Sequence, residues 1–153
     1  DQNMEVERKK IVLPKYVLWR INPDQCDYDL LNKRGDTFSS KAKAVIGYNL
    51  AIGDTLCVVA SGQNKIKGLL GIWKITRNPY WGRFREQACY TEDYKEMRKI
   101  YQYRVHARMK WETNYNSLRD TRSILGNKLN REIPVLLSRE EYLSLRGLTS
   151  IGT

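Results

Sequence analysis

The sequence predicts an α+β fold, in which a curled, mixed and mostly antiparallel sheet resembling a β-barrel is flanked by helices. Three observations predict it. The chain has 153 residues, of which 41% are hydrophobic, and this suits one domain with a real core. Several runs are rich in β-branched and aromatic residues, and turn-forming residues separate them. Segments with helical character are short and lie between or after these runs.

The chain is expected to open with a charged N-terminal extension over residues 1–14. The aromatic and β-branched run 16–21 predicts the first strand, and residues 22–24, with the sequence Asn-Pro-Asp, predict a turn that ends it. Residues 27–34 favour a short helix, because an aspartate stands near its N-cap and a glycine follows its end.

The middle of the chain predicts a pair of neighbouring strands. Residues 41–50 carry apolar residues at helical spacing and favour a short helix. The continuous apolar run 55–60 predicts a strand, and the mostly apolar residues 66–75 predict the next one, after a connection rich in turn formers. Gly68 and Gly71 stand inside the second run, and glycines there predict a bulge or a close approach of the backbone.

The next part of the chain predicts one long strand between two polar stretches. Residues 76–85 are expected to form a loop. Residues 100–111 alternate between apolar and polar residues, as in a half-buried strand with a basic outer face. Residues 112–131 are polar and predict mostly loops, with a short helix over 116–125.

The last part predicts an extended segment at 133–137 and a final short helix. Ser138 and Glu141 have the S-x-x-E spacing of a capping box, and the helix that they open is expected to stop at Gly147. One domain is therefore expected over residues 15–147. Residues 148–153 would form a tail toward a missing downstream region, so that the chain is a piece of a longer protein.

The charge balance predicts an anionic partner. The chain has 27 lysines and arginines against 17 acidic residues, a net charge of +10, and the excess is concentrated between residues 77 and 131. Nucleic acid is the commonest such partner, although basic charge can also serve solubility alone. No apolar run is long enough to span a bilayer, and the first ten residues contain no secretory apolar stretch. The odd number and wide spacing of the three cysteines make a reducing, intracellular compartment the default, and we expect a cytoplasmic protein.

No motif for enzyme chemistry stands out. The sequence contains no G-x-S-x-G, H-E-x-x-H or G-x-x-x-x-G-K, and its one histidine, His106, falls on the basic face of the alternating strand. Cys26, Cys57 and Cys89 are too widely spaced for a zinc knuckle or a disulfide framework, and Cys57 is expected in the core. We expect no enzyme activity, no cofactor and no metal, although a pair of carboxylates brought together in space stays open.

The aromatic residues favour a binding function. Tyr80 and Trp81 stand in the predicted loop, close to Arg83 and Arg85. Rings of this kind stack on bases, at about 1–3 kcal/mol per base, while arginines hold phosphates. A loop tryptophan can equally cover a core, so both interpretations of the pair stay open.

Several segments resemble known domains, in order, over about residues 16–145. The segments 16–24, 51–56 and 66–75 resemble the opening strand and turn, the G-D turn and the following glycine-containing strand of EVE domains. The stretch 81–84 is similar to a W-x-G-R-F stretch of YTH domains, and residues 133–141 resemble the closing strand and helix of EVE domains.

The resemblance implies a fold of the PUA superfamily, a small curled β-barrel flanked by helices. YTH domains bind N6-methyladenine in an aromatic cage. EVE-like domains are associated with modified bases, including as N-terminal specificity domains of McrB-type modification-dependent restriction proteins. For this chain, the resemblance implies a non-catalytic DNA-binding domain that flips a modified, methylated base into an aromatic pocket. The domain would act with a fused nucleotide-hydrolysing or nuclease module. The alternatives are a PUA-type RNA-binding module, including one that reads N6-methyladenine in RNA, and a nuclease or hydrolase of the related ASCH type.

The resemblance also implies a set of site residues. Phe38, Ser39 and Ser40 occupy the position of a family W-D-G or W-C-S, and Asn22 stands where the families place a polar residue near the base edge. The predicted base pocket consists of Trp19, Asn22, Phe38, Ser39, Ser40, Trp73, Tyr80 and Trp81. The residues predicted to hold the nucleic-acid backbone are Arg20, Lys41, Lys43, Arg77, Arg83, Arg85, Arg104, Arg108 and Lys110.

Overall fold

The computed structural model describes residues 13–25, 36–62, 65–82, 90–113, 115–132 and 134–149. The predicted helix at 27–34, the cysteines Cys26 and Cys89, and the arginines Arg83 and Arg85 lie outside the described residues. Nearly all of the predicted N-terminal extension and the end of the predicted tail lie outside them as well.

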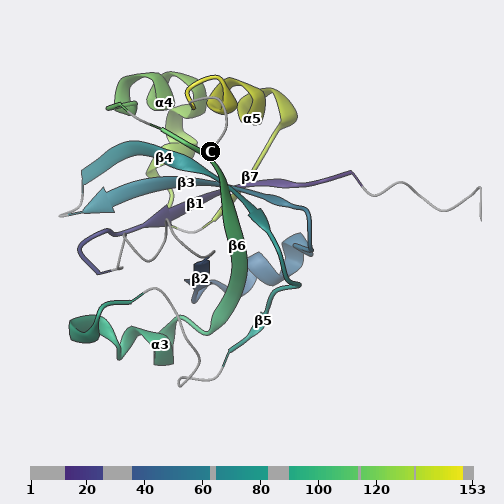
Figure 1. Ribbon diagram of the computed structural model, residues 1–153, viewed down its shortest axis with the longest axis vertical. Helices are drawn as coiled ribbons and strands as arrows, with labels where there is room; N and C mark the ends of the chain where they lie inside the picture. Colours follow the sequence, from purple (N-terminus) through teal and green to yellow (C-terminus); the bar gives the residue numbers. More distant parts are fainter. Residues whose placement is uncertain are drawn as a thin grey trace, which may run out of the picture.

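The predicted fold class is confirmed: the described chain forms a curled mixed sheet with a few helices (Figure 1). The strands are β1 (Tyr16–Ile21), β2 (Asp36–Ser40), β3 (Thr55–Gly62), β4 (Lys65–Ile75), β5 (Tyr80–Trp81), β6 (Tyr103–Glu112) and β7 (Val135–Leu137). The helices are η1 (Lys43–Tyr48), η2 (Glu92–Tyr94), α3 (Met97–Ile100), α4 (Leu118–Leu125), η3 (Gly126–Asn130) and α5 (Arg139–Arg146).

The sheet has the strand order β2-β6-β4-β3-β1-β7, and β5 pairs with β6. β1 runs parallel to β3, and the other pairs are antiparallel. β2 and β1 share no hydrogen bonds, but the sheet curls until their side chains meet. The rings of Trp19 and Phe38 lie edge to face with centroids 6.3 Å apart, and Phe38 lies 5.6 Å from Trp73. Side-chain packing therefore closes the barrel where backbone pairing is absent.

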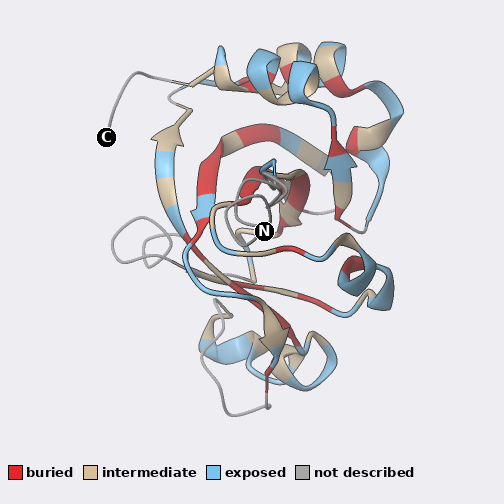
Figure 2. Ribbon diagram, turned by 90° about the vertical axis from the view of Figure 1, so that its right-hand side faces the viewer, coloured by how far each residue is buried: buried red, intermediate tan, exposed pale blue. Residues whose placement is uncertain are grey.

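The sheet separates two hydrophobic clusters. One fills the inside of the curl and includes Trp19, Phe38, Trp73 and Val105. The other lies between the outer side of the sheet and the helices α4 and α5, which pack together over it (Figure 1). Because β3 is covered on both faces, all of its residues except Ser61 are buried, which explains its continuous apolar sequence. Figure 2 shows that buried residues occur along the strands of the curled sheet, whereas the helices also carry exposed residues.

The two glycines of β4 confirm the prediction of close backbone approach. Gly68 has a φ of 111°, and a Cβ on it would meet the backbone nitrogen of Leu118 at 2.7 Å. A Cβ on Gly71 would meet the carbonyl oxygen of Trp111 at 2.5 Å. The ladders of β4 with β3 and with β6 contain register shifts near these positions, so β4 bends and lets the sheet curl.

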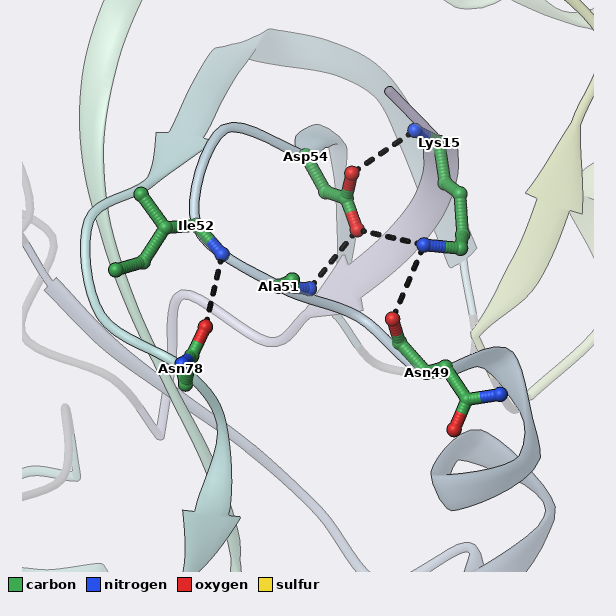
Figure 3. A network of polar contacts seen from close by, with 6 residues as sticks. All are labelled: Lys15, Asn49, Ala51, Ile52, Asp54 and Asn78. Atoms are coloured by element: carbon green, nitrogen blue, oxygen red, sulfur yellow. Dashed lines mark hydrogen bonds and ion pairs between the residues drawn. The ribbon is translucent and has the colours of Figure 1, made fainter. Parts of the chain in front are cut away.

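A buried aspartate joins the start of β1 to the turn before β3 (Figure 3). One carboxylate oxygen of Asp54 accepts the backbone N–H of Lys15 at 3.0 Å, and the other accepts the N–H of Ala51 at 2.9 Å. The ammonium group of Lys15 lies 3.4 Å from the same carboxylate and donates to the carbonyl of Asn49 at 3.0 Å. The network holds β1 in its parallel register beside β3.

The C-terminal prediction is confirmed in detail. Ser138 accepts the backbone N–H of Glu141 at 3.1 Å, and the Glu141 carboxylate accepts the N–H of Ser138 at 2.8 Å, which is the reciprocal pair of a capping box. The helix α5 ends before Gly147, as the sequence predicts. Among the described residues, no helix is long and apolar enough to cross a membrane.

Some element boundaries differ from the predictions. The long strand begins at Tyr103 rather than at residue 100, because residues 97–100 form the short helix α3. The helix expected over 41–50 is the shorter 3₁₀ helix η1. The predicted loop 76–85 contains β5, whose two residues are too few to produce a periodic pattern.

Candidate functional site

A cavity of about 170 Å³ opens where β1 and β2 approach each other without hydrogen bonds. An engineered apolar cavity of about 150 Å³ holds benzene, so this volume accommodates a single flat ring. Its walls come from six separate parts of the chain, and this is possible only because the sheet curls. The lining residues are Trp19, Arg20, Ile21, Asn22, Gln25, Ser39, Ser61, Tyr90, Tyr101 and Glu132.

Two tyrosines form an aromatic wall of the cavity. The ring centroids of Tyr90 and Tyr101 lie 6.0 Å apart, with an angle of 49° between the rings. The hydroxyl groups of Tyr90 and Ser39 are hydrogen-bonded at 2.9 Å, which orients the Tyr90 ring against β2. The ammonium group of Lys41 lies 5.6 Å from the centre of the Tyr101 ring, so a cation stands beside this wall.

Other residues of the cavity lining are polar. The side-chain oxygen of Asn22 accepts the backbone N–H of Asp24 at 2.9 Å, so the amide nitrogen is the donor that Asn22 can offer. The hydroxyl of Ser61 donates to the carbonyl of Ile21 at 3.3 Å. Glu132 adds a carboxylate, which accepts hydrogen bonds when ionised. The cavity therefore combines aromatic surface with donors and acceptors, as a site for a heteroaromatic ring requires.

Arg20 lies in the cavity wall, with its guanidinium group tied to the protein. It donates to the carbonyl of Leu129 at 2.8 Å. Burial lowers its pKa from the usual value, and the nearby charge of Glu132 acts in the opposite direction. Arg20 was predicted to bind the nucleic-acid backbone, and the structure places it beside the cavity instead of on an open surface.

Three of the predicted pocket residues line the cavity: Trp19, Asn22 and Ser39. Phe38 does not, and this prediction needs correction. Alternate residues of a strand face opposite sides, so Ser39 faces the cavity while Phe38 faces the core and is fully buried. Trp73 is also fully buried, and Ser40 is buried with its hydroxyl accepting the N–H of Ala42 at 3.1 Å. None of the three has a surface open to a base.

Tyr80 and Trp81 do not line the cavity either. β5 pairs with β6, on the edge opposite to β2. The hydroxyl of Tyr80 lies 2.7 Å from Nε2 of His106, and its ring stacks on that histidine with centroids 5.5 Å apart. Trp81 is 44% exposed and contacts Tyr103 edge to face. The prediction that these rings close a cage with Phe38 is wrong in this structure, because the pair lies on a different strand edge.

Apart from Arg20, the predicted backbone-binding cations within the described residues separate into two groups. Lys41, Lys43, Arg77, Arg108 and Lys110 are exposed, as the prediction requires. Arg104 is fully buried and donates to the carbonyls of Tyr101 and Arg98, the latter at 3.1 Å. The prediction that Arg104 holds the nucleic-acid backbone is therefore wrong. Arg104 instead positions the segment that carries Tyr101, and so supports the aromatic wall.

The sequence did not indicate Gln25, Ser61, Tyr90, Tyr101 or Glu132 as site residues. Tyr101 was assigned to the alternating strand, and the other four stand in segments without a motif. Among the described residues, no group of three histidine, cysteine or acidic side chains could hold a metal ion. Cys57 is buried, as predicted, and burial raises the pKa of its thiol to about 12.

Solved structures share this architecture. No family model matches the chain, and no curated protein matches it. An ASCH protein from Zymomonas mobilis aligns with a TM-score of 0.56 at 16% identity, over 89% of this chain and 96% of that one. The YTH domain of the Zygosaccharomyces rouxii MRB1 protein, solved in complex with N6-methyladenosine RNA, aligns with a TM-score of 0.57 at 11% identity, over 92% and 91%.

The chain shares the fold of these ASCH and YTH structures. A hypothetical protein from Leishmania major aligns with a TM-score of 0.62 at 15% identity, over 88% of this chain and 94% of that one. These identities are low, so the likeness concerns the fold, and the function has to be argued from the cavity.

Proposed function

We propose that this chain is a nucleic-acid-binding domain that takes one unstacked, modified base into the cavity between β1 and β2. The observation that carries the proposal is the cavity itself, which is sized for a flat ring and is lined by tyrosines and by hydrogen-bonding groups. The net charge of +10 supplies the attraction to phosphates that a nucleic-acid partner requires.

The free energy that a base gains by stacking in the cavity is of the same order as the cost of extruding it from a duplex. Extruding a base from a duplex costs a few kcal/mol, and stacking on aromatic rings returns about 1–3 kcal/mol per base. A methyl group adds only about 0.8 kcal/mol when it is buried, so discrimination of a methylated base depends on a close fit. Trp19, which is almost fully buried in the cavity wall, and the paired Ser39 and Tyr90 hydroxyls form rigid walls of the kind that such a fit needs.

We propose that the domain binds without catalysing a reaction. The one histidine, His106, does not line the cavity, and its ring is engaged by Tyr80 and by the hydroxyl of Thr37 at 3.3 Å. For the polymer we propose DNA and a role as the targeting domain of a modification-dependent restriction system, which the motif resemblance to EVE domains supports. RNA is the second candidate, and the shared fold with a YTH domain bound to N6-methyladenosine RNA favours it.

The test is a binding measurement on matched oligonucleotides. Fluorescence anisotropy with methylated and unmethylated DNA duplexes and single-stranded RNAs, at one salt concentration, identifies the polymer. Tyr101→Ala should weaken binding about tenfold, through the loss of one stacking ring. Tyr115→Ala is the matched control, because Tyr115 is exposed and does not line the cavity. Equal affinity of both variants and wild type for every oligonucleotide would show that the cavity is not the binding site. Cleavage of any of these oligonucleotides by the purified protein would favour the ASCH-type nuclease alternative.

A further inference from the structure

We propose a second subsite, next to the base cavity, that takes the base of the adjacent nucleotide in the same strand. This inference rests on the proposed function. A second cavity, of about 390 Å³, shares Arg20, Asn22, Ser61 and Glu132 with the first. Because these residues line both cavities, the two spaces lie side by side. A strand that places one base in the first cavity brings the next nucleotide, one phosphodiester away, to the second.

Three residues belong to the second cavity alone: Gly62, Ile66 and Asn130. Gly62 ends β3, and a Cβ on it would meet the Asp24 carboxylate at 3.0 Å, so the absence of a side chain leaves this end of the cavity open. Ile66 is half-buried and presents an aliphatic surface on which a ring can pack. Asn130 is exposed at the end of η3 and carries both a donor and an acceptor.

The chemistry of the second cavity favours a base over a phosphate. Glu132 places a negative charge in it, which repels a phosphate. The charge of Arg20, the one cation in its lining, is opposed by the nearby charge of Glu132. A carboxylate accepts from an exocyclic amino group of a base, and asparagine amides pair with base edges that offer both a donor and an acceptor. The subsite therefore suits adenine, cytosine or guanine, which carry an exocyclic amino group for Glu132, better than thymine or uracil, which have none.

The experiment separates the second subsite from the first. A ¹H–¹⁵N NMR titration with a methylated nucleoside monophosphate measures the base cavity alone. The same titration with a dinucleotide that adds adenosine or cytidine on either side measures both subsites. For wild type, we expect the favourable dinucleotide to bind about tenfold more tightly than the mononucleotide, and a flanking thymidine or uridine to add less.

Two variants test the assignment. Asn130→Ala should reduce the dinucleotide gain to about threefold or less while leaving the mononucleotide affinity unchanged. Gly62→Leu is a steric block of the second cavity; because its side chain also meets Asp24 and Asn22, its dinucleotide affinity is compared only with its own mononucleotide affinity. Asn127→Ala is the control, because Asn127 is exposed in the same η3 helix and lines neither cavity. If Gly62→Leu unfolds the protein, the dinucleotide gain of Asn130→Ala alone tests the second subsite, because Asn130 is exposed.

Each result has a distinct meaning. If the mononucleotide binds but the dinucleotide gain is the same in Asn130→Ala and wild type, the second subsite is wrong and the base cavity stands. If neither ligand perturbs any residue of the base cavity, the proposed function fails, and the second subsite fails with it.

Discussion

Trp19 and Phe38 lie on strands that share no hydrogen bond, yet their rings meet edge to face with centroids 6.3 Å apart. This contact closes the curled sheet. It also decides which neighbouring residues face outward, because Ser39, next to Phe38, then points to the cavity that Trp19 lines from the other strand. Closure of the core and formation of the cavity are thus two consequences of one packing arrangement.

The first prediction concerns that contact. Phe38→Ala should destabilise the domain by about 3–5 kcal/mol, because it leaves a void between two buried tryptophans. Trp81→Ala removes a larger but partly exposed ring and should cost about 1 kcal/mol or less. Urea denaturation followed by circular dichroism measures both free energies of unfolding. A smaller loss for Phe38→Ala than for Trp81→Ala would contradict the placement of Phe38 in the core.

The second prediction concerns the Asp54 network. Asp54→Ala leaves the N–H groups of Lys15 and Ala51 without their acceptor, and should lower the free energy of unfolding by about 2–4 kcal/mol. Lys15→Ala should cost about 1 kcal/mol or less, because the lysine side chain is partly exposed and its ion pair is screened by water. Chemical denaturation ranks the two variants, and the reverse order would mean that the ion pair, not the backbone anchoring, dominates.

The third prediction is a pH dependence from Cys57. Burial raises the pKa of its thiol from 9.0 to about 12, so the folded state favours the protonated thiol. The stabilisation is complete below pH 9 and is lost as the pH rises toward 12. Across this range the stability difference between wild type and Cys57→Ala should shrink by about 1.4 kcal/mol per pH unit. Burial raises the pKa values of Tyr103 and Tyr142 in both proteins, and this effect cancels in the difference. The charge of Cys57 raises the pKa of Tyr142 further in wild type alone, and this coupling adds to the shrinkage at high pH. A difference that does not change with pH would exclude a buried thiol.

The fourth prediction concerns salt. If the exposed cations hold phosphates, log Kd rises linearly with log salt concentration, and Lys41→Ala should reduce that slope by about 1. Lys41 is the suitable choice because its ammonium group lies beside the Tyr101 wall of the cavity. Lys128→Ala is the control, since Lys128 is paired with Glu141 at 2.8 Å and lines neither the base cavity nor its neighbour. The same slope in wild type and Lys41→Ala would remove Lys41 from the phosphate contacts.

Local features of the structure were predictable from sequence because their causes are local. The capping box of Ser138 and Glu141 depends on a spacing of three residues, and the bend at Gly68 depends on the missing side chain of one residue. The apolar runs of β1, β3 and β4 and the alternation in β6 reflect which faces of each strand are covered. Trp19, Asn22 and Ser39 were predicted to line the site because their segments resemble those of known domains.

The rest of the site could not be predicted in this way. Tyr90 and Glu132 belong to segments without periodicity, and the alternation around Tyr101 predicted only a strand, so no local pattern shows that the three residues share a cavity. The direction of Phe38 was equally undetermined, because its strand is five residues long and either face could have been the inner one.

By itself, the amino-acid sequence determined the α+β class, most of the strands, the terminal helix and the basic character that suits an anionic partner. The tertiary structure alone decided that Phe38, Trp73 and Arg104 are buried, that Tyr80 stacks on His106, and that the aromatic wall consists of two tyrosines. The physical reason is that strand identity follows from nearest-neighbour chemistry, whereas a cavity forms where a curled sheet brings distant segments together and leaves their facing side chains incompletely packed.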